Sequence, residues 1–171
     1  MVEIPQRYVP SYLTSKDKTK QIKELKKSRK AYKKSTKNPN KKYITRKKIK
    51  SFTSRTSPHI LKARKMYKTR KIVPSKALEK ATQCKRTGLE KIVNKGKGAY
   101  FSSGSRPNQT AHSWGYARLA SAITGGKASA ADFKILEANC KPKSKALKLA
   151  KKHYTKKYKK GLRRVKSVKL E

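Results

Sequence analysis

The excess of positive over negative charge constrains this chain more than any other feature of its sequence. Its 171 residues include 50 lysines and arginines but only 8 acids, so the formal net charge is +42. A compact, isolated chain with such a charge would repel itself strongly. We therefore expect an acidic partner, and nucleic acid, an acidic protein surface or an anionic membrane would each fit.

One stretch of the chain is nearly neutral. Residues 100–140 hold four cations and two acids, a net charge of +2, so the other +40 lies outside this window. Hydrophobic residues make up 34% of the chain, below the roughly 45–50% of a typical globular domain. The sequence thus predicts a mainly α fold, with a small helical core over about 72–140 flanked by basic helices and extended arms.

This division gives three expected regions. Residues 1–71 would form a basic N-terminal arm with helices near 16–34 and 57–68, and residues 141–171 a basic C-terminal helix and tail. Residues 1–15, with Pro5 and Pro10, indicate an extended arm lying on a partner, and residues 35–56 indicate a linker or a second arm. The alternating "YITRKKIKSF" could add a short strand to another molecule.

Helix signals are clearest in the second half of the sequence. Ser57 precedes Pro58 and Ser75 precedes "KALEKAT", which predicts a capped helix at each place. Thr87 and Glu90 have the spacing of a capping box, and Gly96 is expected to end that helix.

Three further helices are predicted downstream. Thr110 would cap a helix that Gly125 and Gly126 end, and its alanines and glycines would allow close helix packing. Ser129 would cap a helix running to Cys140, with Asp132 in its first turn. After Pro142, "SKALKLAKKHYTKKYKK" has the pattern of a basic amphipathic helix.

Cys84 and Cys140 are too few for a disulfide scaffold and match no metal motif. We expect two small buried side chains in a reducing compartment, with a disulfide between them as the alternative. The N-terminus lacks the apolar core of a signal peptide. No apolar run approaches the ~20 residues of a membrane span.

The glycine-rich "NKGKGAYFSSGSRP" could cradle an anion, but it lacks the Walker spacing. A tight loop between two helices is the favoured interpretation. Arg106 and Arg118 are expected in a structural ion pair with Asp132 or Glu137, or else in recognition of a partner's carboxylate or phosphate. The candidate partner-binding or anion-binding cations are Lys95, Lys97, Arg106, Arg118, Arg46, Lys47, Lys48, Arg64, Arg70, Lys156, Lys157, Arg163 and Arg164.

Catalysis is not expected. Eight acids and three scattered histidines offer no catalytic triad or carboxylate pair, so no catalytic residue, cofactor or metal site is predicted. The interleaved tyrosines could stack on bases or form the apolar stripes of docked helices, and we favour the stripes. No helix-turn-helix, zinc-finger or RNA-recognition pattern is present, which makes sequence-specific reading of nucleic acid improbable.

Residues 88–140 carry a more specific signal in "KGKGAY", "SSGSRPNQTAHSW", "ARLASAITGGKA" and "DFKILE". This stretch resembles an uncharacterised lysine-rich domain family of nucleocytoplasmic large DNA viruses, of the chlorovirus and mimivirus type. The resemblance extends more loosely over 60–150. It implies a viral protein and no established activity, and it assigns no functional residue.

The expected function is that of a virion structural protein. The chain would be a multicopy minor capsid or cement protein under the outer shell of a large icosahedral double-stranded DNA virus, made in the host cytoplasm. Its core and cationic arms would bind neighbouring capsid proteins through many linked contacts. The alternative is a protein that condenses or packages the viral DNA through its phosphates without reading sequence. Contact with an inner membrane surface also stays open.

Overall fold

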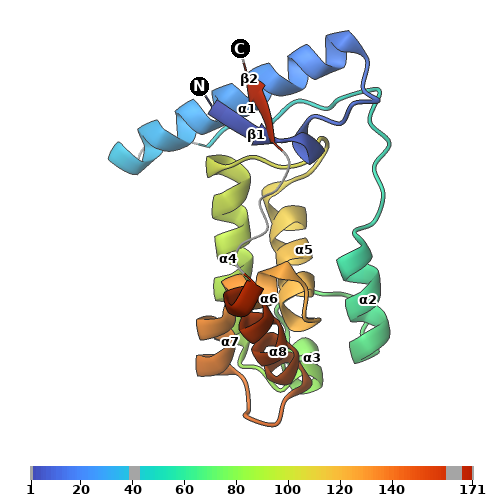
Figure 1. Ribbon diagram of the computed structural model, residues 1–171, viewed down its shortest axis with the longest axis vertical. Helices are drawn as coiled ribbons and strands as arrows, with labels where there is room; N and C mark the ends of the chain where they lie inside the picture. The colour runs from blue at the N-terminus through green and yellow to red at the C-terminus, as the bar shows by residue number, and fades with distance from the viewer. Residues whose placement is uncertain (1, 39–42, 161–166, 171) are drawn as a thin grey trace. The chain divides into compact units, whose positions relative to one another are not determined.

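The computed structural model describes residues 2–38, 43–160 and 167–170 of the chain, and side chains within 4–38 and 43–155 (Figure 1). These residues are mainly helical, with eight α-helices, which confirms the predicted fold class. The chain divides into two compact units. Unit 1 comprises Met1–Arg55, Gly98–Ala111 and Arg164–Glu171, and unit 2 comprises Thr56–Lys97 and His112–Arg163. The units are therefore interleaved along the sequence, and neither coincides with 72–140.

Unit 1 contains one long helix and two short strands. Strand β1 (Val2–Pro5) leads into a 3-10 turn, η1 (Gln6–Tyr8), and then into helix α1 (Ser15–Lys37). β1 pairs antiparallel with β2 (Ser167–Leu170), with Val2 opposite Leu170 and Pro5 opposite Ser167. The hydroxyl of Thr14 caps α1 by accepting a hydrogen bond from the Asp17 N–H, at 3.3 Å.

The expected extended arm over residues 1–15 is wrong for the described residues of that stretch. Ile4, Tyr8 and Leu13 are all buried, because the segment folds back as a strand and a turn that pack within unit 1. Residues 43–55 form no strand, although Ile49 within them is fully buried. The two segments expected to reach outward therefore help to build the interior of unit 1.

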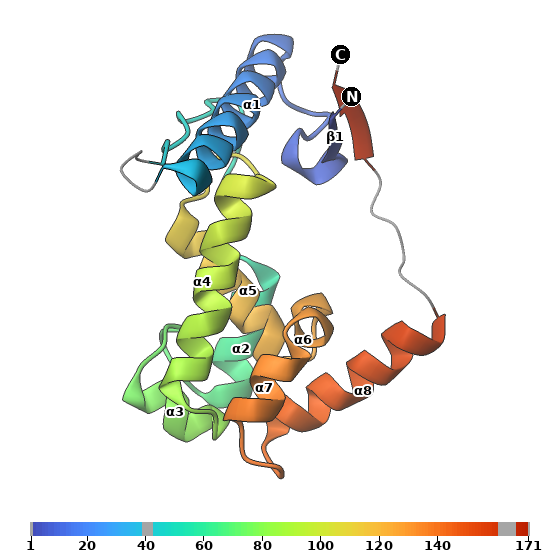
Figure 2. The ribbon, with the colours of Figure 1, turned by 90° about the vertical axis from the view of Figure 1, so that its left-hand side faces the viewer.

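Unit 2 is a bundle of helices. It contains α2 (Pro58–Tyr67), α3 (Lys76–Thr82), α6 (Lys127–Ala131), α7 (Phe133–Asn139) and α8 (Lys145–Lys160), with most of α4 (Arg86–Ser102) and α5 (Ala111–Ile123). Figures 1 and 2 both show α4 and α5 side by side. The apolar core extends beyond the expected 72–140 to Ala63 and Tyr67 of α2 and to Leu147 and Ala150 of α8.

Helix α4 runs straight through Gly96, where the sequence predicted its end. A Cβ atom on Gly96 would lie 2.6 Å from the Cα of Gly115 in α5, so this glycine allows the two helices to touch backbone to backbone. The predicted capping box is also wrong. α4 begins at Arg86, which places Thr87 inside the helix, and Glu90 pairs with Arg86 at 2.8 Å instead.

The other helix starts match the sequence in part. Ser75 caps α3 by accepting from the Leu78 N–H at 3.2 Å, as predicted. Ser57 occupies the position before α2 but its side chain makes no capping bond. The single helix expected from Ser129 to Cys140 is two helices, α6 and α7, separated at Asp132.

Cys84 and Cys140 are both buried, as expected, but they form a disulfide, which corrects the preferred expectation of two free thiols. The residues lie directly opposite each other in an isolated antiparallel bridge. Two backbone hydrogen bonds flank them, from the Lys85 N–H to the Asn139 carbonyl at 2.7 Å and from the Lys141 N–H to the Gln83 carbonyl at 2.9 Å. Side chains at such a site approach closely, which suits a cross-link.

Candidate polyanion-binding surface

Helix α1 has two sharply different faces. Its buried residues are Asp17, Gln21, Leu25, Ser28 and Ser35. At about 100° per residue they span an arc of about 80° on the helix. Eight exposed lysines span an arc of about 120° centred on the opposite side. We call them the α1 lysine face, and they are Lys16, Lys23, Lys26, Lys27, Lys30, Lys33, Lys34 and Lys37.

The two described acids of α1 are turned away from the lysine face. Asp17 accepts hydrogen bonds from the N–H and the hydroxyl of Ser51, at 2.8 and 2.7 Å. These bonds hold the pKa of the Asp17 carboxyl below its ordinary value. Glu24 accepts from the N–H of Lys47 at 2.9 Å. Each carboxylate thus fixes the backbone of residues 47–51 to α1 and leaves the lysine face without an acid.

The buried side of α1 is held mainly by polar contacts. The Gln21 amide donates to the Tyr8 carbonyl at 3.0 Å and to the Ser105 carbonyl at 3.4 Å. The Arg29 guanidinium donates to the Ser103 carbonyl at 2.6 Å. These bonds join α1 to the turn at Tyr8 and to the segment that follows α4.

Arg46 makes several contacts within unit 1. Its guanidinium is 3.7 Å from the centroid of the Tyr100 ring, a close cation–π contact. It donates to the Tyr100 carbonyl at 2.9 Å and to the Ser105 hydroxyl at 2.6 Å. Burial lowers the pKa of Arg46 from its ordinary value. This predicted partner-binding residue is therefore engaged inside unit 1.

The glycine-rich segment expected as a tight loop is mostly helical, because residues 94–102 belong to α4 and only the residues from 103 on connect α4 to α5. Gly98, like Gly96, lies within α4, so the two glycines do not form a cradle. Gly104 has a φ of +95°, and a Cβ atom there would lie 2.7 Å from the Leu25 side chain. The Asn108 amide accepts from the Ile49 N–H at 2.7 Å and donates to the Ile49 carbonyl at 2.9 Å, as a neighbouring strand would.

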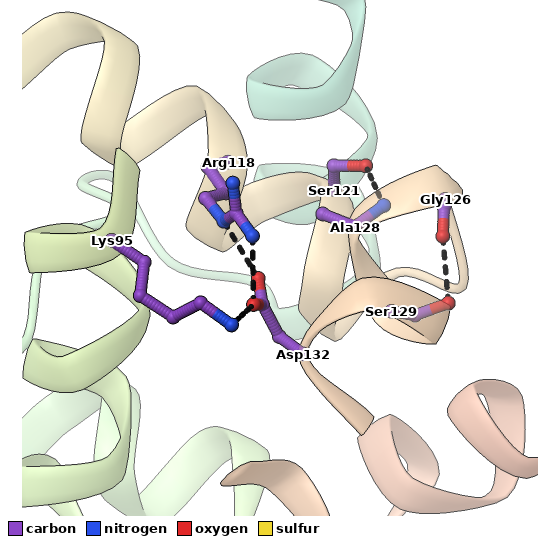
Figure 3. A network of polar contacts seen from close by, with 7 residues as sticks. All are labelled: Lys95, Arg118, Ser121, Gly126, Ala128, Ser129 and Asp132. Atoms are coloured by element: carbon purple, nitrogen blue, oxygen red, sulfur yellow. Dashed lines mark hydrogen bonds and ion pairs between the residues drawn. The ribbon is translucent and has the colours of Figure 1, made fainter. Parts of the chain in front are cut away.

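In unit 2 the structure places Arg118 in the expected ion pair. Its guanidinium binds both carboxylate oxygens of Asp132 at 2.8 Å (Figure 3). The ammonium of Lys95 reaches the same carboxylate, also at 2.8 Å. The Asp132 side chain is fully buried, whereas Lys95 is 48% exposed. Asp132 therefore joins α4 and α5 at the break between α6 and α7.

The remaining predicted cations are distributed over both units. Lys47, Lys48 and Arg106 are exposed in unit 1, and Arg64 and Arg70 are exposed in unit 2, where Lys97 is half-buried. Lys156 and Lys157 belong to α8, but their side chains lie outside the described residues, as do Arg163 and Arg164 altogether.

Sequence reasoning missed the α1 lysine face. The helical spacing of Asp17, Gln21, Leu25 and Ser28 puts these residues on one face of α1. Treating that mostly polar face as the buried one would have predicted the lysine face opposite.

Two aromatic side chains of unit 1 are exposed. Tyr43 is 53% exposed and stacks on Phe101, with ring centroids 4.5 Å apart, and on Tyr32 at 5.9 Å. Tyr12 is 65% exposed and stacks on Phe52 at 6.2 Å. By contrast, Tyr67 in unit 2 is buried and donates to the Ile123 carbonyl at 2.6 Å.

The described residues contain no cluster of three or more histidine, cysteine or acidic side chains arranged to hold a metal ion. None of their helices has the length and apolar character required to span a bilayer.

The comparisons with known proteins give a family and nothing finer. No curated protein and no solved structure matches the chain. A family of unknown function, DUF5824, matches residues 5–140, which cover α1 to α7 and therefore most of both units. The chain belongs to this family of unknown function.

Proposed function

We propose that the protein is a non-catalytic structural protein of a large DNA virus particle, and that it acts by neutralising a polyanion through many weak contacts. The viral setting rests on the resemblance of residues 88–140. The mode of action rests on charge, because 50 cations against 8 acids require an anionic partner.

Within this class the geometry favours condensation of the viral DNA without sequence reading. The α1 lysine face is the observation that carries this choice. It presents eight cations on one rigid helix, whereas the acids of that helix are bound on its other side. Lysine ammonium groups are compact, strongly hydrated charges that suit phosphates and do not make the forked contacts with which arginine reads bases.

The second candidate is a minor capsid or cement protein. The exposed stacks of Tyr12 with Phe52 and of Tyr43 with Phe101 favour it, because exposed aromatic side chains are enriched where proteins dock. The capsid role also uses cationic segments against acidic surfaces. The strand and turn over residues 2–8 are folded onto unit 1, which leaves less chain for threading between neighbours.

Fractionation of the native particle tests the two roles. Particles would be opened gently and separated into emptied shells and released genome, and the protein would be followed in each fraction by immunoblotting. A DNA-condensing protein is expected with the genome and should leave it as salt is raised. Retention on emptied shells would support the capsid role instead. Absence from purified particles would contradict both roles.

A further inference from the structure

The α1 lysine face is a continuous cationic surface of defined length. The arc that it occupies contains no acid, no aromatic residue and no aliphatic residue, because Ser15 and Thr19 are its only other members besides lysines. From Lys16 to Lys37 the face runs for about 32 Å at the rise of an α-helix. A DNA duplex of that length carries about 19 phosphate charges.

The chemistry of the face discriminates between classes of anionic partner. Protein interfaces are depleted in lysine at their centre and are built around apolar and aromatic anchors, which this arc lacks. A helix that binds a membrane surface must bury an apolar face among the lipids. The buried side of α1 is instead occupied by contacts within unit 1, such as those of Gln21 and Asp17. A duplex backbone needs only regularly placed cations.

The helix is fixed before it meets a partner. Its N-terminal end is capped by Thr14, and contacts to Ser51 and Ser103 hold its two halves. Because the lysines lie on one rigid helix, binding a partner costs the conformational entropy of their side chains but not that of a disordered backbone segment. Such a surface should bind a straight duplex better than a flexible single strand of the same charge.

We propose that the α1 lysine face is the principal duplex-binding surface of this protein and that it contacts DNA phosphates without reading bases. This inference rests on the proposed function, since it names the site and the form of the polyanion. Arg29, the one arginine of α1, donates to the Ser103 carbonyl inside unit 1, so the helix offers no exposed fork for bidentate recognition of guanine.

The test compares two variants of the full chain that lose the same charge. One carries Lys23→Gln, Lys27→Gln, Lys30→Gln and Lys34→Gln on α1. The matched control carries Lys145→Gln, Lys148→Gln, Lys151→Gln and Lys152→Gln at exposed positions of α8. Binding to a mixed-sequence duplex of about 30 base pairs would be measured over a range of NaCl concentrations. Circular dichroism and melting curves would confirm that both variants fold.

The α1 variant is expected to flatten the slope of log K against log[salt] by about 3 to 4, because each lost phosphate contact removes about 0.9 from it. At about 0.15 M salt its affinity should fall on the order of 10²-fold. The α8 control should change the slope by less than half as much. Replacing the same four α1 lysines by arginine should restore binding, since the charge is retained.

Equal effects of the α1 and α8 variants would overturn the proposal, because binding would then follow net charge alone. In that case the wild-type protein would still bind DNA and the proposed function would stand. Failure of the wild-type protein to bind any duplex would contradict the DNA role itself. Tighter binding to polyglutamate or to vesicles with about one third anionic lipid than to the duplex would also reject the proposal, in favour of a protein or membrane partner.

Discussion

Asp17 and Asp132 are the buried acids among the described residues, and each joins segments that are distant in the sequence. Asp17 binds the backbone and hydroxyl of Ser51, whereas Asp132 binds two cations, Lys95 and Arg118. Although the chain has few acids, each unit contains one whose buried carboxylate makes such contacts. Removal of the carboxylate would leave neutral donors of Ser51 at the first site but two positive charges at the second.

Removal of the Asp132 charge should destabilise unit 2 strongly. Asp132→Asn would leave Lys95 and the half-buried Arg118 without their counter-ion, and loss of a hydrogen bond to a charged group costs about 1.5–3 kcal/mol. The free energy of unfolding would be measured by denaturant titration. Glu137→Gln removes an exposed acid and serves as the control, with an expected change within about 0.5 kcal/mol. A small effect of Asp132→Asn would show that the network contributes little to folding.

The stabilisation by Asp17 should depend on pH. Its bonds from Ser51 hold the pKa of the carboxyl below its ordinary value of 3.8, so the folded state favours the carboxylate. The stabilisation is therefore fully present above the unfolded pKa and is lost as the pH falls through the folded one. The difference in unfolding free energy between wild type and Asp17→Asn should shrink as the pH is lowered from about 5 to about 3. A difference that stays constant over this range would exclude the linkage.

At the scale of elements, the crossing of α4 and α5 depends on glycine. Gly96→Ala should destabilise the protein by about 1–3 kcal/mol, because the new methyl group would press on the Gly115 backbone. Gly98→Ala is the matched control two residues on, where a Cβ atom meets nothing within 4 Å. There we expect stabilisation by about 0.5–1 kcal/mol from improved helix propensity. Thermal melts of both variants would check the prediction, and equal signs would contradict it.

Local signals in the sequence located most helices but not where some of them end. Helices α2 and α3 begin where predicted. Their start signals, Pro58 after Ser57 in α2 and the Ser75 cap on Leu78 in α3, depend only on residues that are close in the sequence. The continuation of α4 through Gly96 depends on Gly115, a residue of another helix, which no local pattern reports. At the break between α6 and α7, Asp132 contacts Arg118 of another helix, which no local pattern reports either.

The candidate site was harder to predict than the helices because unit 1 is built from polar contacts. Local turn formers and lysines in residues 35–56 indicated a linker, yet Ile49 is bound on both its N–H and its carbonyl by Asn108. The buried stripe of α1 contains one leucine among polar residues, so a search for apolar periodicity passes over it. The lysine face opposite could therefore be placed only once the buried side was known.

At the scale of the whole molecule, both units are assembled from separated parts of the chain. Unit 2 is made of Thr56–Lys97 and His112–Arg163, with residues of unit 1 between them. Closing such long loops costs conformational entropy. The Cys84–Cys140 disulfide joins one part of unit 2 to the other across 56 residues, and neither cysteine belongs to unit 1. The cross-link should therefore act on the stability of unit 2.

Reduction of this disulfide is expected to lower the free energy of unfolding by about 2–4 kcal/mol, because the unfolded chain regains the freedom of a loop of this length. Denaturant titrations with and without a reductant would measure the change, and a Cys84→Ser, Cys140→Ser variant should be insensitive to the reductant. Hydrogen exchange would locate the loss, which we expect at the start of α4 and the end of α7, beside the two cysteines, and not in α1. Equal stability of the oxidised and reduced protein would show that helix packing alone holds the two parts together.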